Sequence, residues 1–190
     1  MRLSDYIAEY FAKKNINQVF SVVGGGAMYL NDSFGRNKDI NVLYNHHEQA
    51  ASIAAESYAR LINKPALVCV TSGPGGTNAL TGCLCAYMGS VPMIIISGQV
   101  RMPFTTRLSD LEIRTIGEQE FDICKASKSL TKYSEMITDP LKIKYHLDKA
   151  LHLATTGRPG PVWLDVPLDI QNAEINEDNL LVYESNSLSK

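Results

Sequence analysis

Short apolar runs alternate along the first half of the chain with stretches whose apolar residues recur at helical spacing. The first stretch, residues 3–14, is expected to be an amphipathic helix with Ser4 as a candidate cap. Almost continuous apolar runs predict strands at 18–23, 40–45, 66–71 and 92–97. Strands that are apolar on both faces and separated by helices are typical of a parallel sheet covered on both sides. The pattern therefore predicts an α/β fold.

The second half of the chain continues this alternation after an interruption. Residues 99–124 mix charges with turn formers and predict a long connection, of the kind that often carries function. A short strand within 127–137, a helix over about 139–155 and a final strand at 161–166 are expected to follow. The whole pattern predicts a doubly wound, mainly parallel sheet of about six strands with helices on both faces.

Length and composition fit one globular domain with a polar end. The chain has 190 residues, 45% of them hydrophobic and 20% charged, which is enough to bury one core. The stretch 171–190 is polar and lacks periodicity, so we expect a domain of residues 1–170 followed by a linker or tail. The net charge of −2, with the basic residues scattered, argues against nucleic acid and anionic membranes as partners.

The four cysteines indicate a reduced, cytoplasmic protein. Cys83 and Cys85 lie too close together for a common zinc site, and Cys69 lies in an apolar run. The N-terminal segment carries acidic residues and lacks the apolar core of a signal peptide, and the run at 92–97 is far too short to cross a bilayer. We therefore expect a soluble protein with reduced thiols.

The candidate ligand-binding residues lie at the ends of the predicted strands. Ligands of doubly wound sheets bind beyond the carboxyl ends of the strands. Here those ends carry GGG (24–26), HHE (46–48), SGPGG (72–76) and SGQ (97–99). Glycine lets a backbone approach a ligand closely, and helix N-termini present free amide donors. A single such end would indicate only a tight turn, but four in series favour a site for a flat or anionic cofactor.

Several common sites do not account for these residues. The GGGAMY segment lacks the lysine and hydroxyl of a phosphate-binding loop and the third glycine of a dinucleotide turn. No serine stands in a Gly-x-Ser-x-Gly elbow. His46, His47 and Glu48 are adjacent and would point to different sides of a helix, so they do not match a zinc site.

The motifs in their order resemble a known family. The segments concerned are VFSVVGGGAMYL, HHEQAASIAAESYAR, KPALVCVTSGPGGTNALTG, SVPMIIISGQV and GRPGPVWLDVPLDIQ. They are similar to the N-terminal, pyrimidine-binding domain of thiamine diphosphate-dependent enzymes, with acetolactate synthase and its relatives as the nearest group. The resemblance runs from about Leu3 to Gln171. It implies an enzyme that acts on a 2-oxo acid.

The resemblance implies a catalytic role for Glu48. In this family a glutamate in the corresponding HEQ segment hydrogen-bonds the ring nitrogen of the cofactor's aminopyrimidine and favours its imino tautomer. Such a carboxyl has to be shielded from water so that it can share a proton with a weakly basic ring nitrogen. The small residues that follow it would let the helix pack closely. A carboxylate that merely favours the helix dipole is compatible with the same position.

Further site residues carry over from the resemblance. The cofactor-binding positions are Gly24, Gly25, Gly73, Pro74, Gly75 and Asn78. Gln119, which is followed by Glu120, matches a glutamine that approaches the active centre, and we assign Gly26 to the same active-centre region. His47 is either a supporting residue of the site or a surface histidine in a helix cap.

The chain also departs from the family pattern. Val23 and Glu118 stand where the family has a proline and an aromatic residue, and the connection 100–117 is longer than usual. These departures leave the identity of the 2-oxo acid and of any acceptor open, and with them the choice between decarboxylation and carboligation. Dependence on FAD is equally open.

The resemblance further implies that the cofactor site is shared. The family binds the diphosphate through Mg²⁺ on a separate domain with a GDG motif, which these residues lack, so no metal ligand is expected here. That domain belongs to another subunit, which implies a homodimer or homotetramer and an inactive isolated chain. The alternatives are a stand-alone subunit of a two-subunit 2-oxo acid decarboxylase and a non-catalytic binding module of the same fold.

Overall fold

The computed structural model describes residues 1–110 and 112–184. Its centre is a six-stranded sheet in the order β2-β1-β3-β4-β6-β5, in which every pair of neighbours is parallel. The strands are β1 Gln18–Ser21, β2 Asn41–Tyr44, β3 Ala66–Val70, β4 Met93–Gln99, β5 Tyr133–Met136 and β6 Pro161–Pro167. All six strands expected from the apolar runs are therefore present, and the predicted α/β fold is confirmed.

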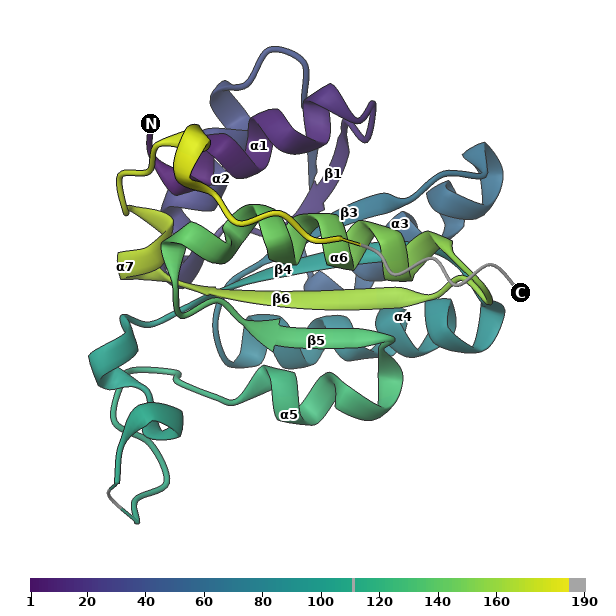
Figure 1. Cartoon of the computed structure of the whole chain (residues 1–190). Helices are drawn as coiled ribbons and strands as arrows, with labels where there is room; N and C mark the ends of the chain where they lie inside the picture. The colour runs from purple at the N-terminus through teal and green to yellow at the C-terminus, as the bar shows by residue number, and fades with distance from the viewer. Residues whose placement is uncertain (111, 185–190) are drawn as a thin grey trace.

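The helices lie on both sides of the sheet (Figure 1). They are α1 Leu3–Lys13, α2 Met28–Arg36, α3 Glu48–Ile62, α4 Pro74–Gly89, α5 Ile123–Ser127, α6 Ile143–Thr155 and α7 Leu168–Gln171. One buried cluster contains residues of α1, α2 and α6, and a second contains residues of α3, α4 and α5. Since each cluster also takes strand residues, the helices cover the sheet on both faces.

The central strands divide their side chains between the two clusters. In β4, Ile94 and Ile96 join the first cluster, and Met93 and Ile95 join the second. All residues of β3, β4 and β6 are buried. Side chains of a strand point alternately to opposite faces, so a strand covered on both faces is apolar at most of its positions. This burial explains the unbroken apolar runs in the sequence.

Two helix starts differ from the prediction. Ser4 does not cap α1: Arg2 holds the cap position without a side-chain cap bond, and the Ser4 hydroxyl accepts a hydrogen bond from Ser33 instead. Helix α4 begins at Pro74, inside the SGPGG segment (72–76), which the sequence analysis assigned only to the end of a strand. Proline suits the first position of a helix because it needs no hydrogen-bond donor there.

Residues 172–184, part of the predicted linker or tail, pack on the body of the domain. The backbone of Leu3 donates to Ala173, and the terminal amino group of Met1 donates to Ile175. The side chains of Ile175 and Leu180 are buried in the first cluster. In Figure 1 this yellow segment runs along α6. Residues 185–190 lie outside the described residues, and the expected connection to a further domain stays a prediction.

Candidate active site

The glycine-rich and polar strand ends all lie at the carboxyl edge of the parallel sheet. The segment after β1 forms a short 3-10 turn, Gly25–Ala27, and β2 leads into α3. The segment after β3 opens α4, and β4 runs into the long loop Val100–Phe121. Because these strands are parallel, their ends converge on one rim, where ligands of such sheets bind.

Glu48 is the first residue of α3 and is 9% exposed. One carboxyl oxygen, Oε2, accepts a hydrogen bond of 2.9 Å from Nδ2 of Asn78 on α4. The other, Oε1, has no hydrogen bond within residues 1–110 and 112–184, and it lies 3.5 Å from the position that a Cβ on Gly75 would take. The fold therefore joins Glu48, Gly75 and Asn78 and leaves one carboxyl oxygen free for a ligand.

The two histidines before Glu48 are exposed. Nδ1 of His47 accepts a hydrogen bond of 3.1 Å from the backbone of Gln49, so His47 caps α3. This is the second of the two roles considered for His47. An acceptor at this position satisfies a backbone donor that would otherwise lack a partner in the first helical turn.

Small residues bring α3 and α4 close together beneath Glu48. A Cβ on Gly82 of α4 would lie 2.6 Å from the backbone carbon of Ser52 on α3. Ala51, Ala55 and Ala79 are fully buried along the same contact. The close approach of the two backbones places Asn78 within hydrogen-bonding distance of Glu48.

Thr71 connects two of the glycine segments. Its hydroxyl accepts a hydrogen bond of 3.0 Å from the backbone of Gly26, and a Cβ on Gly75 would lie 2.6 Å from its methyl carbon. A Cβ on Gly24 would overlap the same side chain, whereas a Cβ on Gly25 would meet nothing within 4 Å. Gly24, Gly26 and Gly75 thus lie around Thr71, and Gly25 is not held in this way.

Sequence reasoning missed Thr71. The only signal in the sequence was the position of Thr71, a β-branched hydroxyl residue between a buried strand and a glycine-rich turn. Its role cannot be recognised without the neighbouring loop, to which its hydroxyl is hydrogen-bonded. The backbone of Gly24–Gly26 becomes its partner only when β1 and β3 lie next to each other in the sheet.

Gly73 and Gln119 meet although they are far apart in sequence. Both have left-handed backbones, with φ of +54° and +57°. A Cβ on Gly73 would overlap the carbonyl oxygen of Gln119, so only glycine fits there. The side chain of Gln119 is exposed, and the buried Glu120 next to it accepts hydrogen bonds from Thr106. The long loop therefore lies directly against the turn that opens α4.

A buried polar chain lies behind this loop and was also missed from sequence. Nε1 of Trp163 donates to the Ser97 hydroxyl at 2.8 Å, and that hydroxyl donates to Oδ1 of Asp165 at 2.6 Å. Nε2 of Gln99 donates to Oδ2 of Asp165 at 3.0 Å and to the carbonyl of Phe121 at 2.9 Å. Burial raises the pKa of the Asp165 carboxyl to about 7, although the bonds from Ser97 and Gln99 favour its ionised form.

A second buried glutamine fastens the loop after β1. Nε2 of Gln171 donates to the carbonyl oxygens of Gly26 and Val166, both at 2.7 Å, and its Oε1 accepts a weaker bond from the backbone of Leu30. Gln171 is fully buried. The sequence placed this residue at the start of a linker, because only the return of the chain after β6 brings it to Gly26.

Other site types have less support in the part of the chain that is described. No group of three or more His, Cys, Asp or Glu residues there could hold a metal ion. None of the described helices has the length and apolarity needed to cross a bilayer. All four cysteines are free, and only Cys85 is exposed.

Comparison with known proteins identifies the family. The family model described as "Thiamine pyrophosphate enzyme, N-terminal TPP binding domain" matches residues 1–125. The chain is 37% identical over 168 residues to the chloroplastic acetolactate synthase of Arabidopsis thaliana, a match that covers 88% of this chain and 24% of the relative. It is 39% identical over 169 residues to the acetolactate synthase large subunit of Haemophilus influenzae, covering 89% of this chain and 28% of the relative.

A third relative has similar coverage. The acetolactate synthase large subunit of Lactococcus lactis is 35% identical over 176 residues, or 93% of this chain and 29% of the relative. The chain thus spans about a quarter of the length of these relatives. With the parallel sheet and the rim around Glu48, these matches show that the chain belongs to the thiamine diphosphate (thiamine pyrophosphate) enzyme family and is an N-terminal cofactor-binding domain of the acetolactate synthase-like type.

Proposed function

We propose that this chain supplies the pyrimidine-binding side of the active centre of an acetolactate synthase-like enzyme, in which Glu48 activates the cofactor. The observation that carries the proposal is the half-satisfied carboxyl group of Glu48. One of its oxygens is held by Asn78, and the other has no hydrogen bond among the described residues. A carboxyl that is largely withdrawn from water and has one free oxygen fits a ring nitrogen that shares a proton with it.

The surrounding residues suit a flat ring. A Cβ on Gly75 would lie 3.5 Å from the free oxygen of Glu48, so the absence of a side chain at Gly75 leaves this side of the carboxyl group uncovered. Backbone without side chains admits a planar group closely. Thiamine diphosphate, when bound, supplies a carbon nucleophile that attacks the carbonyl carbon of a 2-oxo acid. In this proposal Glu48 holds a proton at the pyrimidine nitrogen, Asn78 orients Glu48, and Gln119 faces the substrate.

The remainder of the active centre would come from other parts of the enzyme. The chain spans about a quarter of its relatives, and the proposed Mg²⁺ and diphosphate sites belong to a domain outside these residues. Ile53, Leu84, Tyr87 and Met88 are large exposed apolar residues of α3 and α4. An apolar patch of this kind supports coverage by a second subunit, in a homodimer or homotetramer. The cytoplasmic location stays a prediction, and dependence on FAD stays open.

The test is to replace Glu48 by Gln in the complete polypeptide. We expect turnover of pyruvate, with thiamine diphosphate and Mg²⁺ present, to fall by about 100-fold or more, because the amide cannot share the proton. Glu56→Gln is the matched control: Glu56 is a buried glutamate eight residues further along the same helix, and its carboxylate is bound by Arg60. Full activity of Glu48→Gln would overturn the proposal, and equal losses in both variants would indicate a general defect.

A further inference from the structure

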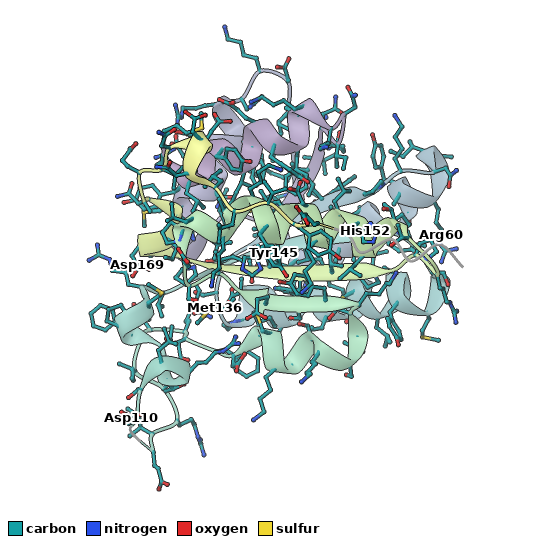
Figure 2. The ribbon with its side chains drawn as sticks, in the orientation of Figure 1. Arg60, Asp110, Met136, Tyr145, His152 and Asp169 are labelled. Carbon is teal, nitrogen blue, oxygen red and sulfur yellow. The ribbon has the colours of Figure 1, made fainter. Side chains whose placement is uncertain are left out.

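The loop of residues 100–121, of which 100–110 and 112–121 are described, leaves the body of the protein after β4 and returns at α5. In Figure 1 it extends away from the sheet, and Figure 2 shows Asp110 near its far end. Among its large apolar side chains, Phe104, Leu108 and Ile113 are about half exposed. Such low apolar burial among its described residues contributes little free energy to offset the entropy of ordering the loop. Its position therefore depends on the few polar contacts that tie it to the body.

One side chain joins the two ends of this loop. Oε1 of Gln99 accepts a hydrogen bond of 3.0 Å from the backbone of Val100, and Nε2 donates to the carbonyl of Phe121 at 2.9 Å. Gln99 is only 2% exposed. The loss of a buried hydrogen-bond partner is costly because water does not replace it. The carboxamide of Gln99 therefore closes the base of the loop.

Asp165 sets the orientation of that carboxamide. Its Oδ2 accepts from Nε2 of Gln99, so the amide nitrogen faces Asp165 and Phe121 while the amide oxygen faces Val100. Oδ1 accepts from Ser97, which is itself bound by Trp163. In this series of hydrogen bonds, each side chain has a partner on the neighbouring strand. The strands β4 and β6 are paired along their whole length. The anchor of the loop is thus built into the sheet.

The closed base lies next to Gln119. Phe121 follows Gln119 by two residues, and the carbonyl oxygen of Gln119 packs against Gly73. The carboxylate of Glu120 accepts hydrogen bonds from Thr106 and from the backbone of Ile116, which join the two sides of the loop. A displacement of Phe121 would therefore move Gln119 relative to the turn at Gly73.

We propose that Gln99 and Asp165 are positioning residues, which fix the loop Val100–Phe121 and thereby hold Gln119 against the Gly73–Gly75 turn. The role of Gln119 toward substrate rests on the proposed function. The anchoring of the loop does not, because it follows from hydrogen bonds within this chain.

Amide hydrogen exchange, read by mass spectrometry on peptides of the protein, tests the anchor. Gln99→Met keeps the length of the side chain and removes its polar atoms. We expect exchange in residues 100–121 to become about tenfold faster or more, while β3 keeps its protection. Gln171→Met is the matched control: the same change at another buried glutamine should loosen residues 26–30 and leave the loop unchanged.

Asp165→Asn provides a second variant of similar shape in case Gln99→Met does not fold. It should accelerate exchange in the same loop peptides. Unchanged loop exchange, or equal acceleration in all peptides, would overturn the proposal. In the complete polypeptide, Gln99→Met should lower kcat/KM for the 2-oxo acid while the affinity for thiamine diphosphate stays unchanged. The two proposals can fail separately. If the unmodified complete polypeptide turns over no 2-oxo acid, the proposed function is wrong. Faster exchange of the loop in Gln99→Met would still support the role of Gln99 as its anchor.

Discussion

Two glycines with left-handed backbones differ in their surroundings. Gly73 has φ of +54° and lies against the carbonyl of Gln119, whereas Gly157 has φ of +62° and is exposed, with nothing near a would-be Cβ. Gly157→Ala should cost about 1–2 kcal/mol of unfolding free energy from backbone strain alone. Gly73→Ala should cost roughly 1–3 kcal/mol more because of the collision. Urea unfolding of both variants measures the difference, and equal costs would contradict the close contact.

Asp165 makes the stability of the protein depend on pH. Burial raises the pKa of its carboxyl from 3.8 to about 7, so the folded state favours the protonated form. This contribution to stability is complete below pH 3.8 and is lost as the pH rises to about 7. Asparagine does not titrate. The free energy of unfolding of the unmodified protein should therefore fall, relative to Asp165→Asn, between these two pH values.

Urea unfolding of both proteins at a series of pH values tests this prediction. The use of the difference between the two proteins removes the contributions of the other titrating groups. Trp163, the single tryptophan, donates to Ser97 in the same chain of hydrogen bonds, so its fluorescence should change near pH 7 in the unmodified protein only. A stability difference that is constant over this range would contradict the prediction.

At the scale of elements, the contact between α3 and α4 depends on a glycine. A Cβ on Gly82 would lie 2.6 Å from the backbone carbon of Ser52, so Gly82→Ala has to push the helices apart. We expect a loss of roughly 1–3 kcal/mol despite the better helix propensity of alanine. Gly35 in α2 is the control, because its Cβ would meet only the hydroxyl of Tyr44, at 3.3 Å.

Gly35→Ala should be neutral or stabilise the protein by up to about 1 kcal/mol. Chemical denaturation measures both substitutions. If Gly82→Ala behaved like Gly35→Ala, the helices would not be in backbone contact. The separation of α3 and α4 should also weaken the hydrogen bond between Asn78 and Glu48, because each residue belongs to a different one of these helices.

At the scale of the whole molecule, the C-terminal segment contributes to the core. Leu180 is 7% exposed and its neighbour Leu181 is 50% exposed. Leu180→Ala should therefore destabilise the protein by about 2–5 kcal/mol, whereas Leu181→Ala should change its stability by no more than about 0.5 kcal/mol. Thermal unfolding of the two variants checks this prediction. Equal small effects would indicate that the segment does not pack on the domain.

The fold could be predicted because its local and global signals agree. The strands β3, β4 and β6 are buried on both faces, so their apolar runs could hardly belong to an amphipathic surface element. The single error at a cap, Ser4, arose because a hydroxyl can bond to a side chain of another helix as well as to its own backbone. In the polar segment after Ile170, Ile175 and Leu180 are buried in the core whereas Leu181 is exposed, a difference that the sequence does not signal.

The sequence by itself determined the fold class and the rim of strand ends, because periodicity and glycine placement are local properties, and its resemblance to the family singled out Glu48. Only the tertiary structure decided how these residues are held. Asn78 meets Glu48, Thr71 meets Gly26, and Gln99 meets Asp165 across neighbouring helices or strands. Such pairs depend on the order of the strands and on the distance between helices, and no residue spacing along one chain encodes either quantity directly.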